Sequence, residues 1–370
     1  MKIGCVKEIK NNEYRVGLTP DNVKSYVNAG HTVYIEDNAG LGSGFTNEEY
    51  EKAGAKIFSQ AEQIWNTVDM MIKVKEPLEE EYPHFREDLI IYTYLHLAAD
   101  QKLTEAMLKS KVKGVAYETL MEKNYTLPLL QPMSQIAGRL SIQEGAKCLE
   151  KHSGGAGLLL SGVPGTPKGK VVIVGGGIVG TNACKIALGM GADVTVIDIN
   201  LERLAYLEDI FGLNIKTLYS SESNIEQALS NADLVIGAVL IPGKAAPKLI
   251  KKEHIRNMKK GSVIVDVAVD QGGCTENTRA TYHDDPTFEV DGVIHYCVGN
   301  MPGAVPRTST IALTNATLQY GLQIAKNGLE SACQKNEVIY SAINTYKGKC
   351  TYKNVAEGFD IKYTDIKTLI

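Results

Sequence analysis

Lys170-Val-Val-Ile-Val-Gly-Gly-Gly-Ile-Val-Gly180 places a short β-branched run directly before the spacing G-x-G-x-x-G. The run, Lys170–Val174, has the length of a buried strand, and Thr181–Met190, after the glycines, has the pattern of a helix. A second strand pattern, Asp193–Asp198, ends on a carboxylate. A strand, a glycine-rich turn, a helix and a second strand that ends on an acidic residue together indicate a dinucleotide-binding unit.

Each glycine of this turn has its own physical role. Gly175 permits the tight turn, Gly177 lets the backbone approach a pyrophosphate, and Gly180 lets the helix pack on the strand. The free N–H groups at the start of the helix favour the phosphates. Asp198 should accept hydrogen bonds from ribose hydroxyls. It should also repel a 2′-phosphate by about 4 kcal/mol, for unit charges ~4 Å apart at an effective dielectric of about 20, which favours NAD over NADP. Three roles stay open for Arg203: binding the ribose or adenine side, relaxing this selectivity, or lying in solvent on a helix.

The first part of the chain also alternates strands and helices. Thr19 and Pro20 have the residue types of a helix N-cap and first turn, and Ser59–Glu62 has the form of a capping box. Such alternation is typical of a mainly parallel sheet covered by helices. Strands are expected at Lys2–Val6, Thr32–Glu36, Asp69–Lys75 and Asp88–Leu95.

A helix and a linker connect this part to the dinucleotide-binding unit. The helix is expected over Gln135–Lys151, and the linker Ser153–Gly169 is rich in glycine and proline. We therefore predict an α/β protein with two Rossmann-like domains, mainly parallel sheets and a cleft between them. The substrate and catalytic domain is expected to be discontinuous, 1–133 plus 305–370, with an NAD-binding domain, 134–304, inserted. Further elements are expected as strands at Leu234–Val239 and Ser262–Val269 and as a helix at Ile311–Lys326.

Polar residues at the ends of the expected strands are the first candidates for chemistry, because ligands in open α/β sheets bind beyond the carboxyl ends of the strands. Arg15 follows the first strand, and Lys75 and His96 close or follow two later apolar runs. Asp270 ends the run SVIVDVAVD. Any one of these residues could be a surface charge, or a buried histidine in the case of His96, but four at four strand ends favour a site. Asp266, inside the same run, is interpreted as a hydrogen-bonded structural residue.

This combination of side chains suits a 2-oxo acid. Arg15 can hold a carboxylate bidentately, and Lys75 can offer a point charge to the carboxylate or the carbonyl oxygen. His96 titrates near neutrality and can move a proton on the carbonyl or carbinol oxygen. Asp270 can accept a proton from water or ammonia, or stabilise a cationic imine. Either His96 or Asp270 can be the principal acid–base group.

The composition points to a small-molecule partner. The 370 residues are 44% hydrophobic, enough for two domains with their own cores. A net charge of −4 without a basic block argues against nucleic acid and against a membrane surface. No apolar run reaches the ~18–20 residues that span a bilayer. The seven cysteines form no C-x-x-C pair, so we expect neither disulfides nor a metal site, and a cytoplasmic location.

Once these stretches are assembled, the chain resembles the alanine dehydrogenase family, within the wider group that includes the soluble NAD-binding part of proton-translocating transhydrogenase. The resemblance covers nearly all of residues 1–330, and several blocks in one order are more specific than any single motif. The chain departs at Gly4-Cys5-Val6, where the family more often has Gly-Val-Pro. The blocks are KEIKNNEYRVGLTP (7–20), LLQPMSQIAGR (129–139), 171–200, 239–244, SVIVDVAVDQGG (262–273) and NMPGAVPRTST (300–310).

The resemblance implies NAD-dependent interconversion of L-alanine with pyruvate and ammonia by a homohexamer. It implies that Arg15 and Lys75 bind the substrate and that His96 and Asp270 are the catalytic pair. The residues that it implies for the rest of the pocket are Met133 and Asn300. Besides Gly175, Gly177 and Gly180, those implied for NAD are Ser134, Ile178, Val179, Asp198, Arg203, Ser220, Val239, Leu240, Val267, Ala268, Val269, Asp270, Arg279, Val298, Gly299, Asn300 and Met301.

Three other functions are compatible with a dinucleotide-binding unit. A transhydrogenase subunit would keep that unit without needing the full substrate set, and Gly180-Thr-Asn-Ala is more similar to the dehydrogenase. A non-enzymatic NAD-sensing protein would bind the cofactor without turnover. A 2-hydroxy-acid dehydrogenase would use lactate in place of alanine.

Overall fold

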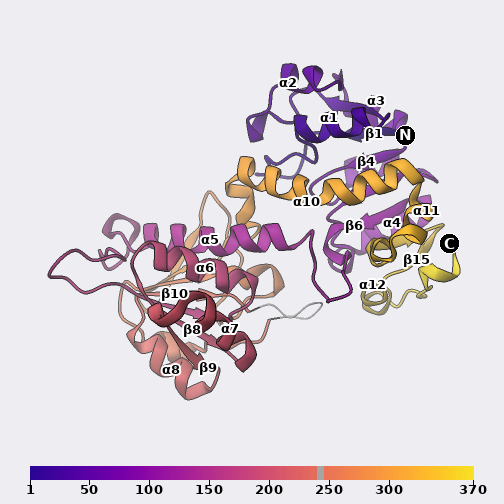
Figure 1. Ribbon diagram of the computed structural model, residues 1–370. Helices are drawn as coiled ribbons and strands as arrows, with labels where there is room; N and C mark the ends of the chain where they lie inside the picture. Colours follow the sequence, from indigo (N-terminus) through magenta and orange to yellow (C-terminus); the bar gives the residue numbers. More distant parts are fainter. Residues whose placement is uncertain (240–245) are drawn as a thin grey trace. The chain divides into compact units, whose positions relative to one another are not determined.

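The computed structural model describes residues 1–239 and 246–370. The chain divides into two compact units. Unit 1 comprises Met1–Met133 and Val305–Ile370, and unit 2 comprises Ser134–Ala304. Each unit has its own mainly parallel sheet with helices, which confirms the predicted α/β class (Figure 1).

Unit 1 is built on an eight-stranded sheet, and all of its residues are described. Six parallel strands follow the order β3-β2-β1-β4-β5-β6, and β14 and β15 extend the β6 edge in antiparallel fashion. The order reverses between β1 and β4, and such a switch point is where open α/β sheets bind ligands. The strands are β1 Lys2–Cys5, β2 Thr32–Glu36, β3 Lys56–Phe58, β4 Met70–Ile72, β5 Ile90–Thr93, β6 Lys113–Ala116, β14 Ile343–Tyr346 and β15 Lys349–Cys350.

The helices of unit 1 come from both of its segments. The orange helix α10 of Figure 1 packs against α1, where Gly321 makes room for Tyr26: a Cβ at Gly321 would lie 2.0 Å from the Tyr26 hydroxyl. The helices are α1 Pro20–Asn28, α2 Asn47–Lys52, α3 Ala61–Thr67, α4 Gln101–Ser110, α10 Pro306–Asn327, α11 Leu329–Lys335 and α12 Lys353–Gly358.

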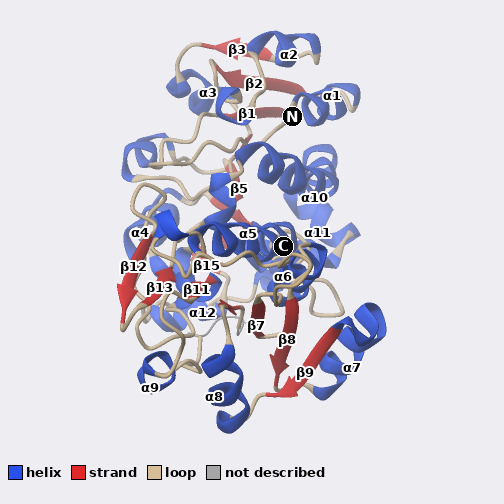
Figure 2. Cartoon of the chain, turned by 90° about the vertical axis from the view of Figure 1, so that its left-hand side faces the viewer, coloured by secondary structure: helices blue, strands red, loops and turns tan. Residues whose placement is uncertain are grey.

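In its described residues, unit 2 has a seven-stranded sheet with the order β9-β8-β7-β10-β11-β13-β12. All its strands are parallel except β12 at the edge, and Figure 2 shows β7, β8 and β9 side by side. The switch point of this sheet lies between β7 and β10. The strands are β7 Lys170–Val174, β8 Asp193–Asp198, β9 Ile215–Tyr219, β10 Leu234–Gly237, β11 Val263–Asp266, β12 Thr287–Val290 and β13 Val293–Tyr296. Helix α5, Gln131–Cys148, begins three residues before the start of unit 2 at Ser134. The other helices are α6 Ile178–Gly189, α7 Leu201–Phe211, α8 Glu222–Asn231 and α9 Lys252–Arg256.

The N-termini of three helices can be compared with the predictions from the sequence. Thr19 is the N-cap of α1 and its hydroxyl accepts the Asn22 N–H, as predicted. The capping box at Ser59–Glu62 is wrong, because α3 begins only at Ala61 and its N-cap has no side-chain hydrogen bond. Helix α5 begins before the predicted Gln135, because Pro132 is tolerated in its first turn.

Several predicted strands end earlier than expected. Strand β4 ends at Ile72 and β5 at Thr93, so Lys75 and His96 lie in the segments beyond those strands. The run Ser262–Val269 was predicted as one strand, but β11 ends at Asp266 and a 3₁₀ turn, Val267–Gln271, follows it. The Asp266 carboxylate accepts the Ala268 N–H at 3.1 Å and so caps this turn.

Candidate functional site

The glycine-rich turn of unit 2 is shaped by close backbone contacts. Gly175 has φ of +106°, and a Cβ there would lie 2.7 Å from the carbonyl oxygen of Ala238. A Cβ at Gly180 would lie 1.8 Å from the carbonyl oxygen of Gly175. Any side chain at either position would therefore force β7, α6 and the segment after β10 apart.

The start of α6 has the properties of an anion site. Its N-cap is Gly177, which supplies no side chain to accept the first N–H groups of the helix. A Cβ at Gly177 would meet no atom within 4 Å, so this glycine leaves open space beside those donors. Unsatisfied N–H groups and the positive end of the helix dipole fit the pyrophosphate of a dinucleotide.

Asp198 lies at the end of β8, beside the glycine-rich turn. Its Oδ2 accepts the Gly176 N–H at 2.6 Å, and its Oδ1 accepts the Asn200 N–H at 2.8 Å. Each carboxylate oxygen can accept a further hydrogen bond, so the geometry is compatible with ribose hydroxyls as donors.

Arg203 takes a role that the three sequence alternatives do not include. Its Nε donates to the Gly176 carbonyl at 2.6 Å, and its Nη2 donates to the Thr181 hydroxyl. The guanidinium also lies 4.7 Å from the ring centroid of Tyr206. Arg203 therefore holds the glycine-rich turn onto α6.

The remaining residues predicted for NAD lie mostly just beyond strand ends of unit 2. Ser220 follows β9, Val239 follows β10, and the predicted Leu240 lies outside the described residues. Ser134 lies on α5 and Arg279 packs its guanidinium 4.3 Å from the Phe288 ring centroid. Ile178 and Val179 open α6, Val267, Ala268, Val269 and Asp270 form the turn after β11, and Val298, Gly299, Asn300 and Met301 follow β13.

Asp270 is exposed on the 3₁₀ turn after β11. Its Oδ2 accepts the Asn300 N–H at 3.3 Å, and a Cβ at Gly299 would lie 3.0 Å from its Oδ1. Unit 2 therefore brings Asp270 and Asn300 together. Asp266 is fully buried and accepts N–H groups from the neighbouring loop, Cys274 N at 3.0 Å among them, which is a structural role.

Arg15 of unit 1 is buried and is held by a carboxylate. Its Nε donates to Glu13 Oε1 at 2.7 Å and its Nη2 to Glu13 Oε2 at 2.5 Å, while its Nη1 lies 3.2 Å from the sulfur of Met133. Burial would lower the pKa of Arg15, but Glu13 outweighs it and raises that pKa. The structure thus brings two predicted substrate residues, Arg15 and Met133, into contact.

Lys75 follows β4 on a segment held by a buried charge network. Glu8 Oε1 accepts the Val74 N–H at 2.6 Å and the Lys75 N–H at 3.2 Å. The ammonium of fully buried Lys73 lies 3.0 Å from Glu8 Oε2 and 2.8 Å from Glu81 Oε1. Burial raises the pKa of the Glu8 carboxyl, against the attraction of Lys73.

Glu76 is a carboxylate of unit 1 with three basic side chains near it. It is buried, its Oε1 accepts from the Lys10 ammonium, and its Oε2 has no hydrogen-bond partner among the described residues. Although burial would raise the pKa of Glu76, the nearby Lys75, His96 and Lys10 lower it. Burial lowers the pKa of Lys75 against the attraction of Glu76, with a further contribution from nearby Arg15. In unit 1, the predicted Arg15 and His96 are therefore linked through charge interactions with Lys75 and Glu76.

His96 has an exposed side chain beyond β5. Its ring stacks on Tyr94, with centroids 5.9 Å apart. Its backbone N–H donates to Glu118 Oε1 at 2.6 Å, and Glu118 follows the neighbouring strand β6.

The sequence interpretation missed the carboxylates that surround the predicted site residues of unit 1. Glu13 stands two residues before Arg15, and Glu76 directly follows Lys75, so both carboxylates are local in sequence. Glu8 and Glu118 carry no local signal, because they reach their partners only through the order of the strands.

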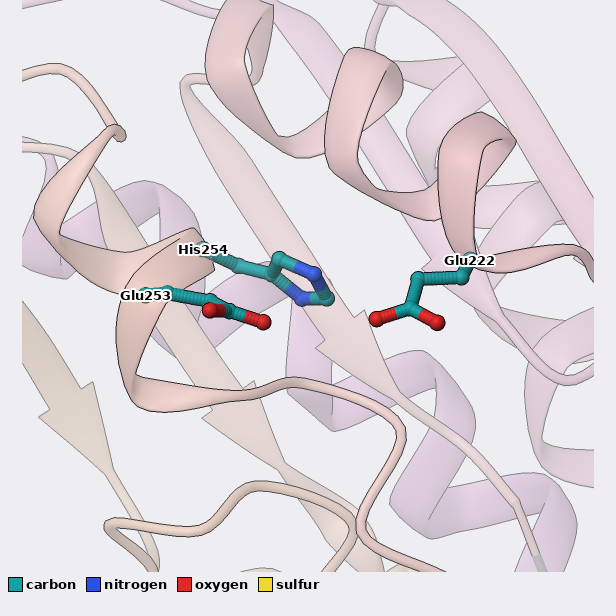
Figure 3. A group of neighbouring side chains, drawn as sticks. All are labelled: Glu222, Glu253 and His254. Atoms are coloured by element: carbon teal, nitrogen blue, oxygen red, sulfur yellow. The ribbon is translucent and has the colours of Figure 1, made fainter.

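Three potential metal ligands of unit 2, Glu222, Glu253 and His254, also lie near one another (Figure 3). The Lys251 ammonium pairs with Glu222 and lies 3.9 Å from Glu253, so a cation already compensates the two carboxylates. His254 Nδ1 accepts the Lys251 N–H at 3.2 Å. We therefore assign no metal to this group.

A membrane-crossing helix would have to be both long and apolar, and no helix in the described part of the chain meets that requirement.

Comparison with known proteins gives matches along nearly the whole chain. Residues 4–137 match the family described as alanine dehydrogenase/PNT, N-terminal domain, and residues 141–353 match its C-terminal domain. An alanine dehydrogenase of Staphylococcus haemolyticus is 56% identical over 99% of this chain and 98% of its own length. A solved structure of an L-alanine dehydrogenase has a TM-score of 0.95 and 51% identity, covering 97% of this chain and 99% of that one. A transhydrogenase from Sinorhizobium meliloti has a TM-score of 0.80 and 25% identity, covering 95% and 99%.

Proposed function

Because the chain belongs to the alanine dehydrogenase/PNT family, we propose that it is an NAD-dependent oxidoreductase that interconverts L-alanine and water with pyruvate and ammonia. Its relatives at 55 and 56% identity over 99% of the chain are alanine dehydrogenases. The observation that carries the proposal is the grouping of Arg15, Lys75 and His96 beyond neighbouring strands of unit 1. Arg15 and Lys75 can bind a substrate carboxylate through their positive charges, and His96 can transfer a proton.

Unit 2 supplies the proposed cofactor residues. The N–H groups at the start of α6 would hold the pyrophosphate, and Asp198 would hold the ribose. Held by these residues, NAD would supply the acceptor for the hydride that leaves the substrate Cα. Arg203 would act indirectly, since its guanidinium is bonded to the turn that receives the pyrophosphate.

Unit 1 supplies the proposed substrate residues. Arg15 and Lys75 would bind the carboxylate of alanine or pyruvate, and Met133 would contact its methyl side. Glu13 holds the guanidinium of Arg15 in one orientation, so little ordering is left for substrate binding. Unit 2 would contribute Asn300, whose backbone N–H donates to Asp270, to the substrate residues.

Proton transfer is proposed for His96 and Asp270. The substrate amine must lose a proton before hydride leaves Cα, and the resulting iminium must then gain water and release ammonia. His96 would exchange the proton on the substrate oxygen, and Asp270 would accept protons from water or the amine. Because the two residues belong to different units, the proposed chemistry draws on both halves of the chain.

A direct assay tests the proposal. We expect the purified chain to form NADH from L-alanine and NAD, and to consume NADH with pyruvate and ammonium, both followed by NADH absorbance. L-Lactate with NAD is the control for a hydroxy-acid dehydrogenase. Binding of NADH without turnover of alanine would contradict the proposal and would favour a cofactor-binding protein.

We also propose a cytoplasmic homohexamer whose discontinuous unit 1 binds the substrate and whose unit 2 binds NAD. All seven cysteines are free and buried, as suits a reducing compartment. Light scattering after size exclusion would test the assembly, and a mass other than six chains would contradict it.

A further inference from the structure

The backbone of His96 has a conformation that is uncommon for a residue with a side chain. Its φ of 49° and ψ of 30° lie in the left-handed region, and a 3₁₀ segment, Leu97–Ala99, begins immediately after it. A conformation of this kind persists only where the surrounding structure holds it. Without such support, a histidine at this position would return to a more common backbone region and carry its ring elsewhere.

The group that holds this turn is the carboxylate of Glu118. Its Oε1 accepts the His96 N–H at 2.6 Å and the Leu95 N–H at 3.2 Å, and its Oε2 lies 3.2 Å from the same Leu95 nitrogen. Glu118 forms no salt bridge with any described residue, so these two backbone N–H groups are the partners that the structure shows for it. Strand β6, which precedes Glu118, is hydrogen-bonded along β5, which precedes His96.

A second carboxylate of unit 1 accepts backbone N–H groups beyond a neighbouring strand in the same way. Glu8 follows β1 and accepts the N–H groups of Val74 and Lys75, which follow the neighbouring strand β4. A carboxylate therefore holds the backbone of each of these two site residues from an adjacent strand. Glu8 also pairs with buried Lys73, so its removal would disturb a larger network. Glu118 offers the cleaner test.

We infer that Glu118 is a positioning residue for His96: its carboxylate accepts the N–H groups of Leu95 and of left-handed His96 and thereby aims the imidazole at the substrate. This inference rests on the proposed role of His96 in proton transfer. Glu118 acts through the backbone, so its hydrogen-bond geometry matters and its charge does not.

The experiment compares Glu118→Gln with Glu118→Asp. Glutamine keeps the length and an oxygen that can accept both N–H groups, whereas aspartate keeps the charge but is one methylene too short to reach them. We expect Glu118→Gln to retain kcat within about threefold, and Glu118→Asp to lose about ten- to a hundredfold, the range expected when a catalytic group is misplaced by an ångström or less. The KM for pyruvate and the NADH dissociation constant should change far less.

Glu36→Ala is the matched control. Glu36 ends β2 and accepts the Lys7 N–H, which follows β1, at 2.7 Å, so it makes the same kind of contact away from His96. We expect this variant to keep its kcat. Thermal unfolding of all variants reports whether any loss of activity reflects loss of fold.

A double-mutant comparison separates this inference from the proposed function. His96→Ala alone should lower kcat, and adding Glu118→Asp to it should lower kcat no further. Near-normal turnover in His96→Ala would remove the proposed role of His96, and this inference with it. If His96→Ala is impaired, the inference alone is overturned by wild-type kcat in Glu118→Asp, by equal losses in the Gln and Asp variants, or by additive losses in the double variant.

Discussion

Units 1 and 2 share the strand order 3-2-1-4-5-6 across their parallel strands, but they present different chemistry beyond the carboxyl ends of those strands. Unit 1 presents charged side chains, several of them buried, such as Arg15, Lys73 and Glu76. Unit 2 presents backbone N–H groups and the open space that glycine leaves, as at Gly177.

This difference between the units reflects the chemistry of the ligand proposed for each. A buried charge is unstable unless it is paired, so unit 1 matches its cations with carboxylates in advance. A dinucleotide needs close approach of the backbone, so unit 2 depends on the absence of side chains. Substitutions in unit 1 should therefore impair the site by removing the partner of a buried charge. Substitutions in the glycine-rich turn of unit 2 should impair it by adding atoms where the cofactor needs space.

The largest effect is expected from an added atom in unit 2. Gly180→Ala places a Cβ 1.8 Å from the Gly175 carbonyl oxygen, which must displace the glycine-rich turn. We expect NADH binding, followed by fluorescence, to weaken beyond detection. Gly189→Ala, in the same helix, is the control, because its Cβ would meet no atom within 4 Å. Normal binding by Gly180→Ala would remove the turn from the cofactor site.

Loss of a proposed proton-transfer group should come next. His96→Ala and Asp270→Asn should each lower kcat at least about a hundredfold, since a general acid or base typically contributes ~10²–10⁴-fold. The NADH dissociation constant should change far less. Near-normal turnover of either variant would exclude that residue from the mechanism.

Arg15→Lys tests pairing in unit 1. Lysine keeps the charge but cannot bind both Glu13 oxygens and contact Met133 in one planar arrangement. We expect kcat/KM for pyruvate to fall about ten- to a hundredfold, with NADH affinity unchanged. An equal loss of NADH affinity would indicate a folding defect in place of a lost carboxylate clamp.

His295 is an exception in unit 2, a buried titratable side chain whose two ring nitrogens have no hydrogen-bond partner among the described residues. Burial lowers the pKa of His295 from 6.5 to about 4. The unfolded chain then binds the proton more readily, so stability is complete above pH 6.5 and falls as the pH drops toward 4. From about pH 7 to about pH 5 the free energy of unfolding should fall by about 2 kcal/mol because of His295.

Urea unfolding of His295→Leu tests this prediction. The free energy of unfolding of this variant should depend on pH less strongly than that of the unchanged chain, by the same amount. An unchanged dependence would contradict the assignment.

The smallest effect is expected at the exposed end of the cofactor site. Asp198→Ala removes the proposed ribose acceptor and the charge that repels a 2′-phosphate. Solvent screens this partly exposed carboxylate, so we expect the NAD/NADP ratio of kcat/KM to fall about tenfold. An unchanged ratio would place Asp198 away from the ribose.

Elements with a local cause could be predicted from the sequence. Strands Lys170–Val174 and Asp193–Asp198 were predicted with the bounds that the structure has, because β-branched runs, glycines and the terminal aspartate are adjacent along the chain. The α/β class followed from the same alternation of strands and helices. The i, i+2 spacing of Glu13 and Arg15 is equally local.

The pairing of carboxylates with site residues depends on the order of the strands, and so on the tertiary structure. Glu118 reaches His96, and Glu8 reaches Lys75, only because β6 lies beside β5 and β1 beside β4. The turn that carries Asp270 was likewise misjudged as strand, because its cap from Asp266 overrides the β-branched residues in it. Hydrogen bonds of this kind join residues that are distant in sequence or that compete with local propensity, so neither composition nor spacing contains them.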